Sequence, residues 1–264
     1  MTTTLQSLIE TAWEHRTEKQ SDEAREAVRT TLELLTAGEV RAASRGDDGQ
    51  WQVHEWVKKA ILLHFRLTDS RPMEAGSLHF FDKVEVQGNW EKKGVRVVPP
   101  TSVRIGAHVA PGAILMPCFV NIGAYVGAGT MIDTWSTVGS CAQVGSNCHI
   151  SGGVGIGGVL EPLQAAPVIV EDNVFIGARG EVAEGVRVGE GAVLAMGCYV
   201  SASTKIVDTV NGGRVFRGEI PPRAVVVPGS LPSADGSHST YALIIKKYRD
   251  AQTDAKTALN EILR

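Results

Sequence analysis

The chain has 264 residues, of which 43% are hydrophobic and 21% charged, and its formal net charge is −3. This length is sufficient for a hydrophobic core and for more than one domain, and the small net charge excludes a surface dedicated to nucleic acids or anionic membranes. No apolar stretch is long enough to cross a bilayer, and the first residues lack the basic and then apolar pattern of a signal peptide, so we expect a cytoplasmic protein.

Residues 1–70 are predicted to form a helical N-terminal domain, because apolar side chains recur there with the spacing of amphipathic helices. This spacing is shown by Leu5, Leu8, Ile9, Ala12 and Trp13, by Val28, Thr31, Leu32 and Leu35, and by Val53, Val57, Ala60, Ile61, His64 and Phe65. Ser70-Arg71-Pro72 ends the third helix, since a residue before proline disfavours the helical conformation. Residues 71–96 are predicted to be a linker with short strands.

A period of six residues dominates the middle of the chain. An aliphatic residue, called an anchor below, recurs at Val103, Val109, Leu115, Val120, Val126, Ile132, Val138, Val144, Ile150, Ile156, Val170, Ile176, Val182, Val188, Leu194 and Val200. The spacing changes twice: five residues separate Leu115 from Val120, and fourteen separate Ile156 from Val170. We interpret the fourteen as two hexads with two inserted residues.

This period fits neither a helix nor an alternating strand, and it is typical of the hexapeptide repeats of a parallel β-helix. Three hexads form one coil of eighteen residues, in which each anchor points inward and glycine serves many of the corners. Residues 97–204 are therefore predicted to be a β-helix, so that the fold is mainly β.

Residues 205–264 are predicted to cap the β-helix with a hairpin, a closing strand and a C-terminal helix. The hairpin turns at Asn211-Gly212-Gly213, and IPPRAVVVPG supplies the closing strand. The helix is predicted over residues 239–264, where Ile245, Tyr248, Leu259, Ile262 and Leu263 are apolar.

The four cysteines are predicted to be free and packed in the core. Cys118, Cys141, Cys148 and Cys198 all lie within the repeat, and no two form a C-x-x-C pair. This spacing argues against disulfides and against a structural zinc site.

One part of the repeat is the least regular, namely MIDTWSTVGSCAQVGSNCHISGGVGIGGVLEPLQAAP. Together with GVRVVPP, EDNVFIGARGEVAEG and STKIVD, it resembles the tetrahydrodipicolinate N-succinyltransferase family, and the resemblance covers nearly the whole chain. It implies a left-handed β-helix, homotrimers with active sites between subunits, and no metal. The implied reaction is succinyl transfer from succinyl-CoA to the amino group of tetrahydrodipicolinate, in its L-2-amino-6-oxopimelate form, in lysine and diaminopimelate biosynthesis.

The resemblance also implies roles for individual residues. Arg96 would bind a substrate carboxylate, Asp133 would contact the substrate near its amine, and Glu181 would be the general base. The developing oxyanion needs N–H donors, which the glycine-rich backbone of Ser151, Gly152 and Gly153 could present closely. We therefore expect Gly152 and Gly153 to bind the acyl-CoA, and Lys205 to contact a coenzyme A phosphate. The chain departs from the family at SASTKI, usually GKSTKI, and at ARGEV, usually ARSEV.

Spacing suggests how the two carboxylates are used. Asp133 and Glu181 are 48 residues apart, which is more than two and a half coils after two inserted residues are removed. At the usual strand spacing this amounts to roughly 12 Å along the axis, and the count places them near different corners. We therefore predict that they reach one substrate from different chains.

Other interpretations remain open at this stage. Asp133 could serve a corner, Glu181 could be a solvated charge, Arg96 could cap the first coil, and Trp135 could pack at a subunit interface. A hexapeptide acetyltransferase would use acetyl-CoA with His149 or His108 as base. A carbonic anhydrase would need three histidine ligands for zinc, of which the repeat offers only these two. The chain could also be a non-enzymatic scaffold.

Overall fold

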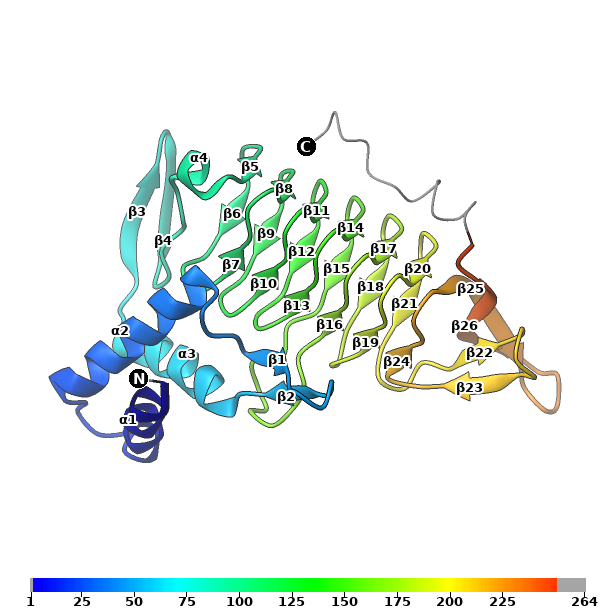
Figure 1. Cartoon of the computed structure of the whole chain (residues 1–264), viewed down its shortest axis with the longest axis horizontal. Helices are drawn as coiled ribbons and strands as arrows, with labels where there is room; N and C mark the ends of the chain where they lie inside the picture. Colours follow the sequence, from blue (N-terminus) through cyan, green and yellow to red (C-terminus); the bar gives the residue numbers. More distant parts are fainter. Residues whose placement is uncertain (1, 251–264) are drawn as a thin grey trace.

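The computed structural model describes residues 2–250 and shows three regions in sequence order. Helices and a hairpin lie at one end of a long stack of β-coils, and a set of longer strands lies at the other end (Figure 1). The stack occupies the middle of the chain, where the period of six was found.

The N-terminal region contains three helices at the segments with helical spacing. They are α1 (Thr2–Glu14), α2 (Asp22–Ala37) and α3 (Glu55–Leu67). The Ser21 side chain accepts a hydrogen bond from the Ala24 N–H at the start of α2, and Gly38 ends this helix in a left-handed conformation. A hairpin of β1 (Ala43–Arg45) and β2 (Trp51–Val53) was not predicted. None of the helices within residues 2–250 is long and apolar enough to cross a membrane.

The predicted linker contains a second hairpin and a short helix. β3 (Arg71–Ala75) pairs with β4 (Leu78–Asp82) in antiparallel register, and α4 (Trp90–Lys93) ends at Gly94 just before the first coil.

The coils form three faces of parallel strands, named here in the order in which the chain visits them. The first face contains β5 (Arg96–Val97), β8 (Ile114–Leu115), β11 (Met131–Ile132), β14 (His149–Ile150), β17 (Phe175–Ile176) and β20 (Val193–Leu194). The second face contains β6 (Ser102–Val103), β9 (Phe119–Val120), β12 (Thr137–Val138), β15 (Gly155–Ile156), β18 (Glu181–Val182) and β21 (Tyr199–Val200). The third face contains β7 (His108–Val109), β10 (Tyr125–Val126), β13 (Gln143–Val144), β16 (Ile169–Val170), β19 (Arg187–Val188) and β24 (Glu219–Ile220).

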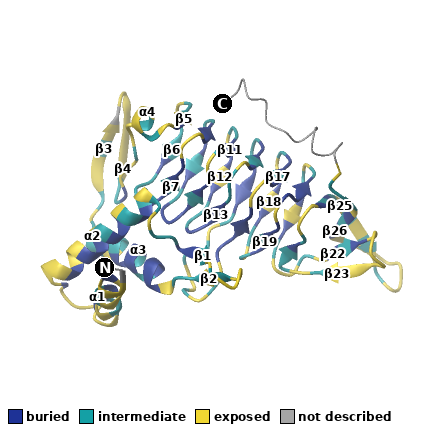
Figure 2. Cartoon of the chain, viewed as in Figure 1, coloured by how far each residue is buried: buried dark blue, intermediate teal, exposed yellow. Residues whose placement is uncertain are grey.

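All sixteen anchors are buried in one hydrophobic cluster inside this prism, which confirms the parallel β-helix (Figure 2). In most strands of the coil the first residue points outward and the second, the anchor, points inward, so the two-residue strands alternate as a pleated strand must. The four cysteines are free and buried, as predicted, and Cys148 and Cys198 lie in the same cluster.

The insertion after Ile156 is longer than predicted. Val144 pairs with Val170, 26 residues later, whereas one coil has eighteen. Eight residues are therefore looped out between β15 and β16, so the fourteen-residue spacing is one hexad plus eight residues, and the interpretation as two hexads plus two is wrong. The Lys58 side chain on α3, which is fully buried, donates a hydrogen bond of 2.6 Å to the Ala165 carbonyl in this loop.

The C-terminal region ends the solenoid with strands. The predicted hairpin is present as β22 (Ile206–Asp208) and β23 (Arg214–Phe216), and β25 (Ala224–Pro232) continues the first face after β20. The predicted helix is wrong for residues 239–248: they form β26 (Ser239–Tyr248), which pairs with β25 and β22. The remainder of that prediction, residues 251–264, lies outside the described residues.

Candidate active site on the glycine edge

The corners between the first and second faces form a continuous edge of the prism, called the glycine edge here. It consists of residues 133–136, 151–154, 177–180 and 195–198. Backbone hydrogen bonds stack these corners on one another: Gly153 N–H donates to Thr134, Arg179 N–H to Gly152 and Gly197 N–H to Ala178. Residues far apart in sequence therefore lie in register along one line.

Three charged side chains from the coils on either side converge on residues 152–155. A Cβ built on Gly152 would lie 4.0 Å from Asp133 Oδ2, and one on Gly153 would lie 2.6 Å from Arg179 Nη1. A Cβ on Gly155 would collide with the carboxyl group of Glu181. The glycine-dense sequence thus leaves room for functional side chains of neighbouring coils.

Glu181 is the first residue of β18, so its side chain points outward, and it pairs in the sheet with Gly155 and Tyr199. Its carboxyl group lies against the bare backbone of Gly155. Partial burial there raises the pKa of Glu181 above the ordinary glutamate value. A carboxylate with a raised pKa is a stronger base than one in bulk water.

Asp133 opens the corner after β11 and is half-buried. Its Oδ1 accepts hydrogen bonds from the Thr134 N–H at 2.6 Å and from Thr134 Oγ1 at 3.1 Å. These bonds fix the carboxylate plane and direct Oδ2 toward Gly152. The corner role considered from the sequence is therefore real, and it leaves one oxygen available.

The spacing argument for Asp133 and Glu181 needs correction. Because eight residues are looped out, the two residues are two coils and four residues apart, or about 10 Å along the axis. Asp133 lies in the glycine edge and Glu181 directly follows it, so the placement near different corners is wrong. Their arrival from different chains stays a prediction, which the single chain does not test.

The structure does not bring the other two predicted residues to this edge within one chain. Arg96 lies on β5, two strands before β11 on the first face, and lines a cavity of about 560 Å³ at the edge between the third and first faces, together with Gly129 and Asn147. Lys205 is exposed beyond β21, toward the C-terminal end of the solenoid.

The two histidines of the repeat have different surroundings. His108 stacks on Tyr125 and its Nδ1 contacts the Thr36 carbonyl, so it packs the helical region against the third face. His149 lies on the first face beside Phe175, and its Nε2 is buried without a hydrogen-bond partner. Burial lowers the pKa of His149, while the charge of Asp133 opposes this shift. No three His, Cys, Asp or Glu side chains gather to form a metal site in the part of the chain that is described.

Large apolar side chains project into solvent along the same edge. Trp135 is 65% exposed, Met196 70% and Tyr199 54%. The cavity of about 430 Å³ between α2 and α3 lies elsewhere. A single chain therefore presents its acidic and basic groups on an open edge with an apolar border.

Arg179 is a residue that the sequence analysis did not single out. The signal was available in the ARGEV segment, where an arginine stands two residues before the proposed base. Its significance depends on the bare Gly153 of the neighbouring coil, which only the stacking reveals.

These features define a transferase of the hexapeptide-repeat type: residues 167–202 match the hexapeptide repeat of succinyl-transferase, and residues 4–67 match the tetrahydrodipicolinate N-succinyltransferase N-terminal family. The chain is 56% identical to the 2,3,4,5-tetrahydropyridine-2,6-dicarboxylate N-succinyltransferase of Polynucleobacter asymbioticus, over 98% of both chains. It is 53% identical to that of Acinetobacter baylyi, again over 98% of both. The chain belongs to the tetrahydrodipicolinate N-succinyltransferase family.

Solved structures show a partial likeness. The acetyltransferase domain of PglB from Neisseria gonorrhoeae, solved with acetyl coenzyme A, has 22% identity and a TM-score of 0.36, covering 48% of this chain and 54% of its own. Nothing about the site follows from so slight a similarity.

Proposed function

We propose that this protein transfers the succinyl group of succinyl-CoA to the amino group of tetrahydrodipicolinate in its L-2-amino-6-oxopimelate form. The products are N-succinyl-2-amino-6-oxopimelate and CoA, in lysine and diaminopimelate biosynthesis. Family membership supplies the substrates. The observation that supports the chemistry is the Glu181 carboxyl group held against Gly155 with a raised pKa.

The reaction is a direct attack on the thioester. The amine nitrogen forms a bond to the thioester carbon, the carbonyl electron pair moves to oxygen, and Glu181 takes the proton that the nitrogen loses. The intermediate then expels CoA by breaking the C–S bond, and the thiolate takes up a proton. No metal and no covalent enzyme intermediate is needed.

The oxyanion can be stabilised by the backbone of the glycine edge. Ser151 and Gly153 N–H groups are used in the stack, donating to Ile176 and Thr134, whereas the Gly152 N–H has no acceptor among residues 2–250. An unpaired N–H on a residue without a side chain can approach the thioester oxygen closely. We assign this donor to Gly152, with Asp133 Oδ2 beside it to hold the substrate amine.

We further propose a homotrimer of left-handed β-helices with active sites between subunits. The open edge and its exposed Trp135, Met196 and Tyr199 support a covering neighbour, because large exposed apolar groups mark interaction sites. Arg96 would contact the substrate carboxylate from another subunit, and Lys205 would contact coenzyme A. The free, buried cysteines are consistent with a cytoplasmic location.

Release of free thiol from succinyl-CoA in the presence of tetrahydrodipicolinate tests the function. The wild-type protein should release thiol only when both substrates are present, and Asp133→Asn and Glu181→Gln should each be strongly impaired. Equal rates in the wild type and both variants would contradict the assigned roles.

Mixing the two inactive variants tests the intersubunit site. If Asp133 and Glu181 act from different chains, randomly mixed trimers should regain about a quarter of the wild-type sites, since each site then needs one intact residue from each of two chains. If the two residues act from one chain, no activity returns on mixing.

One observation favours a second candidate, an acetyltransferase with His149 as base. The buried Nε2 of His149 has no partner and lies near Asp133. In that case acetyl-CoA would be used at least as well as succinyl-CoA, and His149→Gln rather than Glu181→Gln would abolish turnover.

A further inference from the structure

Arg179 presents an unpaired cation on the glycine edge. The residue is exposed, and its guanidinium makes no hydrogen bond or ion pair with any other residue in the described range 2–250. Its backbone N–H does donate to Gly152 at 3.1 Å, so the main chain at this position is fixed. Arg179 is therefore an exposed cation on a fixed segment of backbone.

The Arg179 side chain starts from a corner of fixed backbone geometry. The backbone is left-handed there, with φ of 58°, as it is at Trp135, the equivalent position two coils earlier, with φ of 60°. The guanidinium lies across Gly153, where a Cβ would approach its Nη1 to 2.6 Å and its Cζ to 2.8 Å. A planar guanidinium laid on bare backbone is preorganised to bind an anion with two oxygens.

The proposed base lies beside this cation in the same chain. Glu181 lies over Gly155, two residues from the Gly153 that Arg179 covers, and neither Glu181 nor Asp133 is bonded to Arg179. The two carboxylates have other tasks in the proposed reaction. The Arg179 guanidinium is therefore available to an anion from a bound molecule.

We propose that Arg179 binds the free carboxylate of the succinyl group and so selects succinyl-CoA over uncharged acyl-CoA. This inference depends on the proposed function. Gly153 and Gly155 are two residues, or about 7 Å, apart along the chain, and the guanidinium lies against the first while the base lies against the second. The attacking amine, which contacts the base, lies about 3 Å from the thioester carbon, and the succinyl chain adds about 4 Å from that carbon to its carboxylate.

Arg96 does not fit this task within the same chain. It lies on the edge between the third and first faces, two strands before β11. Arg179 is two residues from the base and shares its coil. The acceptor's carboxylates are thus left to Arg96 of another subunit, and the acyl carboxylate to Arg179.

The test compares acyl donors that differ in this one charge. Butyryl-CoA carries a methyl group where succinyl-CoA carries its carboxylate. In Arg179→Gln, the ratio of kcat/KM for succinyl-CoA to that for butyryl-CoA should fall by about 10- to 100-fold, the effect of losing a charge-assisted bidentate contact. Arg179→Lys should lower this ratio by an intermediate amount, because lysine keeps the positive charge but cannot form the bidentate contact. Both substitutions keep the same left-handed backbone requirement.

Arg187→Gln is the matched control. Arg187 lies on the third face, paired with Glu219, and its loss should leave the ratio of the two donors unchanged. A parallel fall of kcat/KM for both donors in Arg179→Gln overturns the proposal, as does a rise in the acceptor KM with an unchanged donor ratio. A loss of trimer on gel filtration would instead assign Arg179 to a subunit contact, and that too overturns it. Failure of the proposed function is distinct, because the wild type itself would then release no thiol from succinyl-CoA.

Discussion

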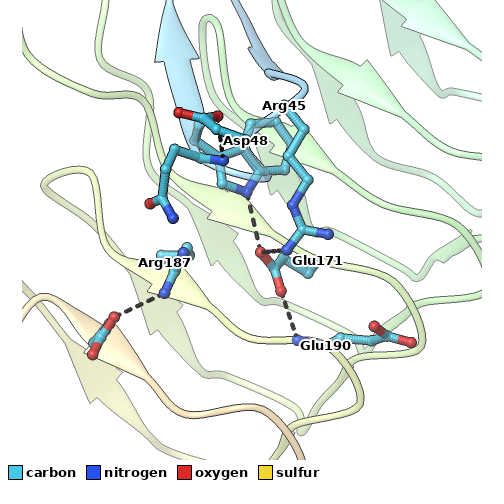
Figure 3. A network of polar contacts seen from close by, with 8 residues as sticks. Arg45, Asp48, Glu171, Arg187 and Glu190 are labelled. Atoms are coloured by element: carbon cyan, nitrogen blue, oxygen red, sulfur yellow. Dashed lines mark hydrogen bonds and ion pairs between the residues drawn. The ribbon is translucent and has the colours of Figure 1, made fainter.

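The third face and the glycine edge of the same prism use polar side chains in opposite ways. On the third face, polar groups are paired across regions of the chain. Glu171 Oε1 accepts from Arg45 at 2.9 Å and from Trp51 Nε1 at 3.1 Å, and its Oε2 accepts from the Glu190 N–H (Figure 3). These bonds attach the β1–β2 hairpin to the coils.

Arg41 extends this attachment. Its guanidinium lies 3.7 Å from the centre of the Tyr125 ring and its Nε donates to Gln143, which is fully buried. Burial lowers the pKa of Arg41, an effect that the neighbouring Tyr125 and Asp172 oppose. On this face each polar group described above has a partner within the chain.

On the glycine edge, by contrast, Asp133 Oδ2, Arg179 and the Gly152 N–H are left without partners among residues 2–250. A buried polar group must be paired or it destabilises the fold, whereas an exposed group can stay unpaired until a ligand arrives. The difference indicates which polar groups stabilise the protein and which serve chemistry. Variants on the two surfaces should accordingly affect different measurements.

The largest effect is expected for Glu181→Gln. Removal of a general base should lower kcat by about 10²- to 10⁴-fold, while the thermal midpoint stays unchanged because the carboxyl group accepts no bond that holds the fold. Thiol release and thermal unfolding measure the two quantities. If the thermal midpoint fell together with kcat, Glu181 would belong with the side chains that stabilise the fold.

Glu171→Ala should show the reverse behaviour. Trp51 Nε1 and the Glu190 N–H lose their acceptor, and we expect a loss of about 2 kcal/mol in the free energy of unfolding with kcat nearly unchanged. Denaturant unfolding checks this value. Glu33→Ala is the control, because its ion pair with Arg29 is exposed and its loss should change the free energy of unfolding much less.

Gly155→Ala tests whether catalysis depends on the position of the Glu181 carboxyl group while the fold is retained. The three atoms nearest to the added methyl group all belong to the carboxyl group of Glu181, at the end of a flexible side chain, and the backbone of Gly155 is not left-handed, so we expect the fold to accommodate the change. The displaced base should lower kcat by about 10-fold or more. Gly88→Ala, where a Cβ meets open space, should change neither activity nor stability. Wild-type activity in Gly155→Ala would show that the base does not act from this position.

The smallest expected effect concerns pH. Glu181 must be deprotonated to act, so kcat/KM should fall as the pH falls through its pKa, which burial raises above the ordinary glutamate value. In Gly155→Ala the carboxyl group moves toward solvent, and the midpoint of this limb should shift to lower pH. If the wild type and Gly155→Ala showed the same dependence of kcat/KM on pH, contact with Gly155 would not be the cause of the raised pKa of Glu181.

The sequence was most informative where one rule repeats. A narrow prism requires an aliphatic side chain at every inward position, so all sixteen anchors could be identified without knowledge of their partners. The corners were less predictable, because a looped-out segment such as 157–168 leaves no periodic trace and its true length of eight extra residues appears only from the pairing of Val144 with Val170.

Residues 239–248 show the limit of local pattern. Their apolar spacing is compatible with a helix, but pairing along the whole of β25 makes them a strand, because long-range hydrogen bonds override helix propensity. The β1–β2 hairpin was missed for a similar reason: its contacts to Glu171 come from 126 residues away.

By itself, the sequence determined the β-helix, its inward residues and, through family motifs, the candidates Asp133 and Glu181. Only the tertiary structure decided that these two share an edge with Arg179, and that the glycines between them are bare because neighbouring side chains lie on them. The physical reason is that contacts along a solenoid run between coils, so residues that touch are separated by whole coils and by any insertion between them.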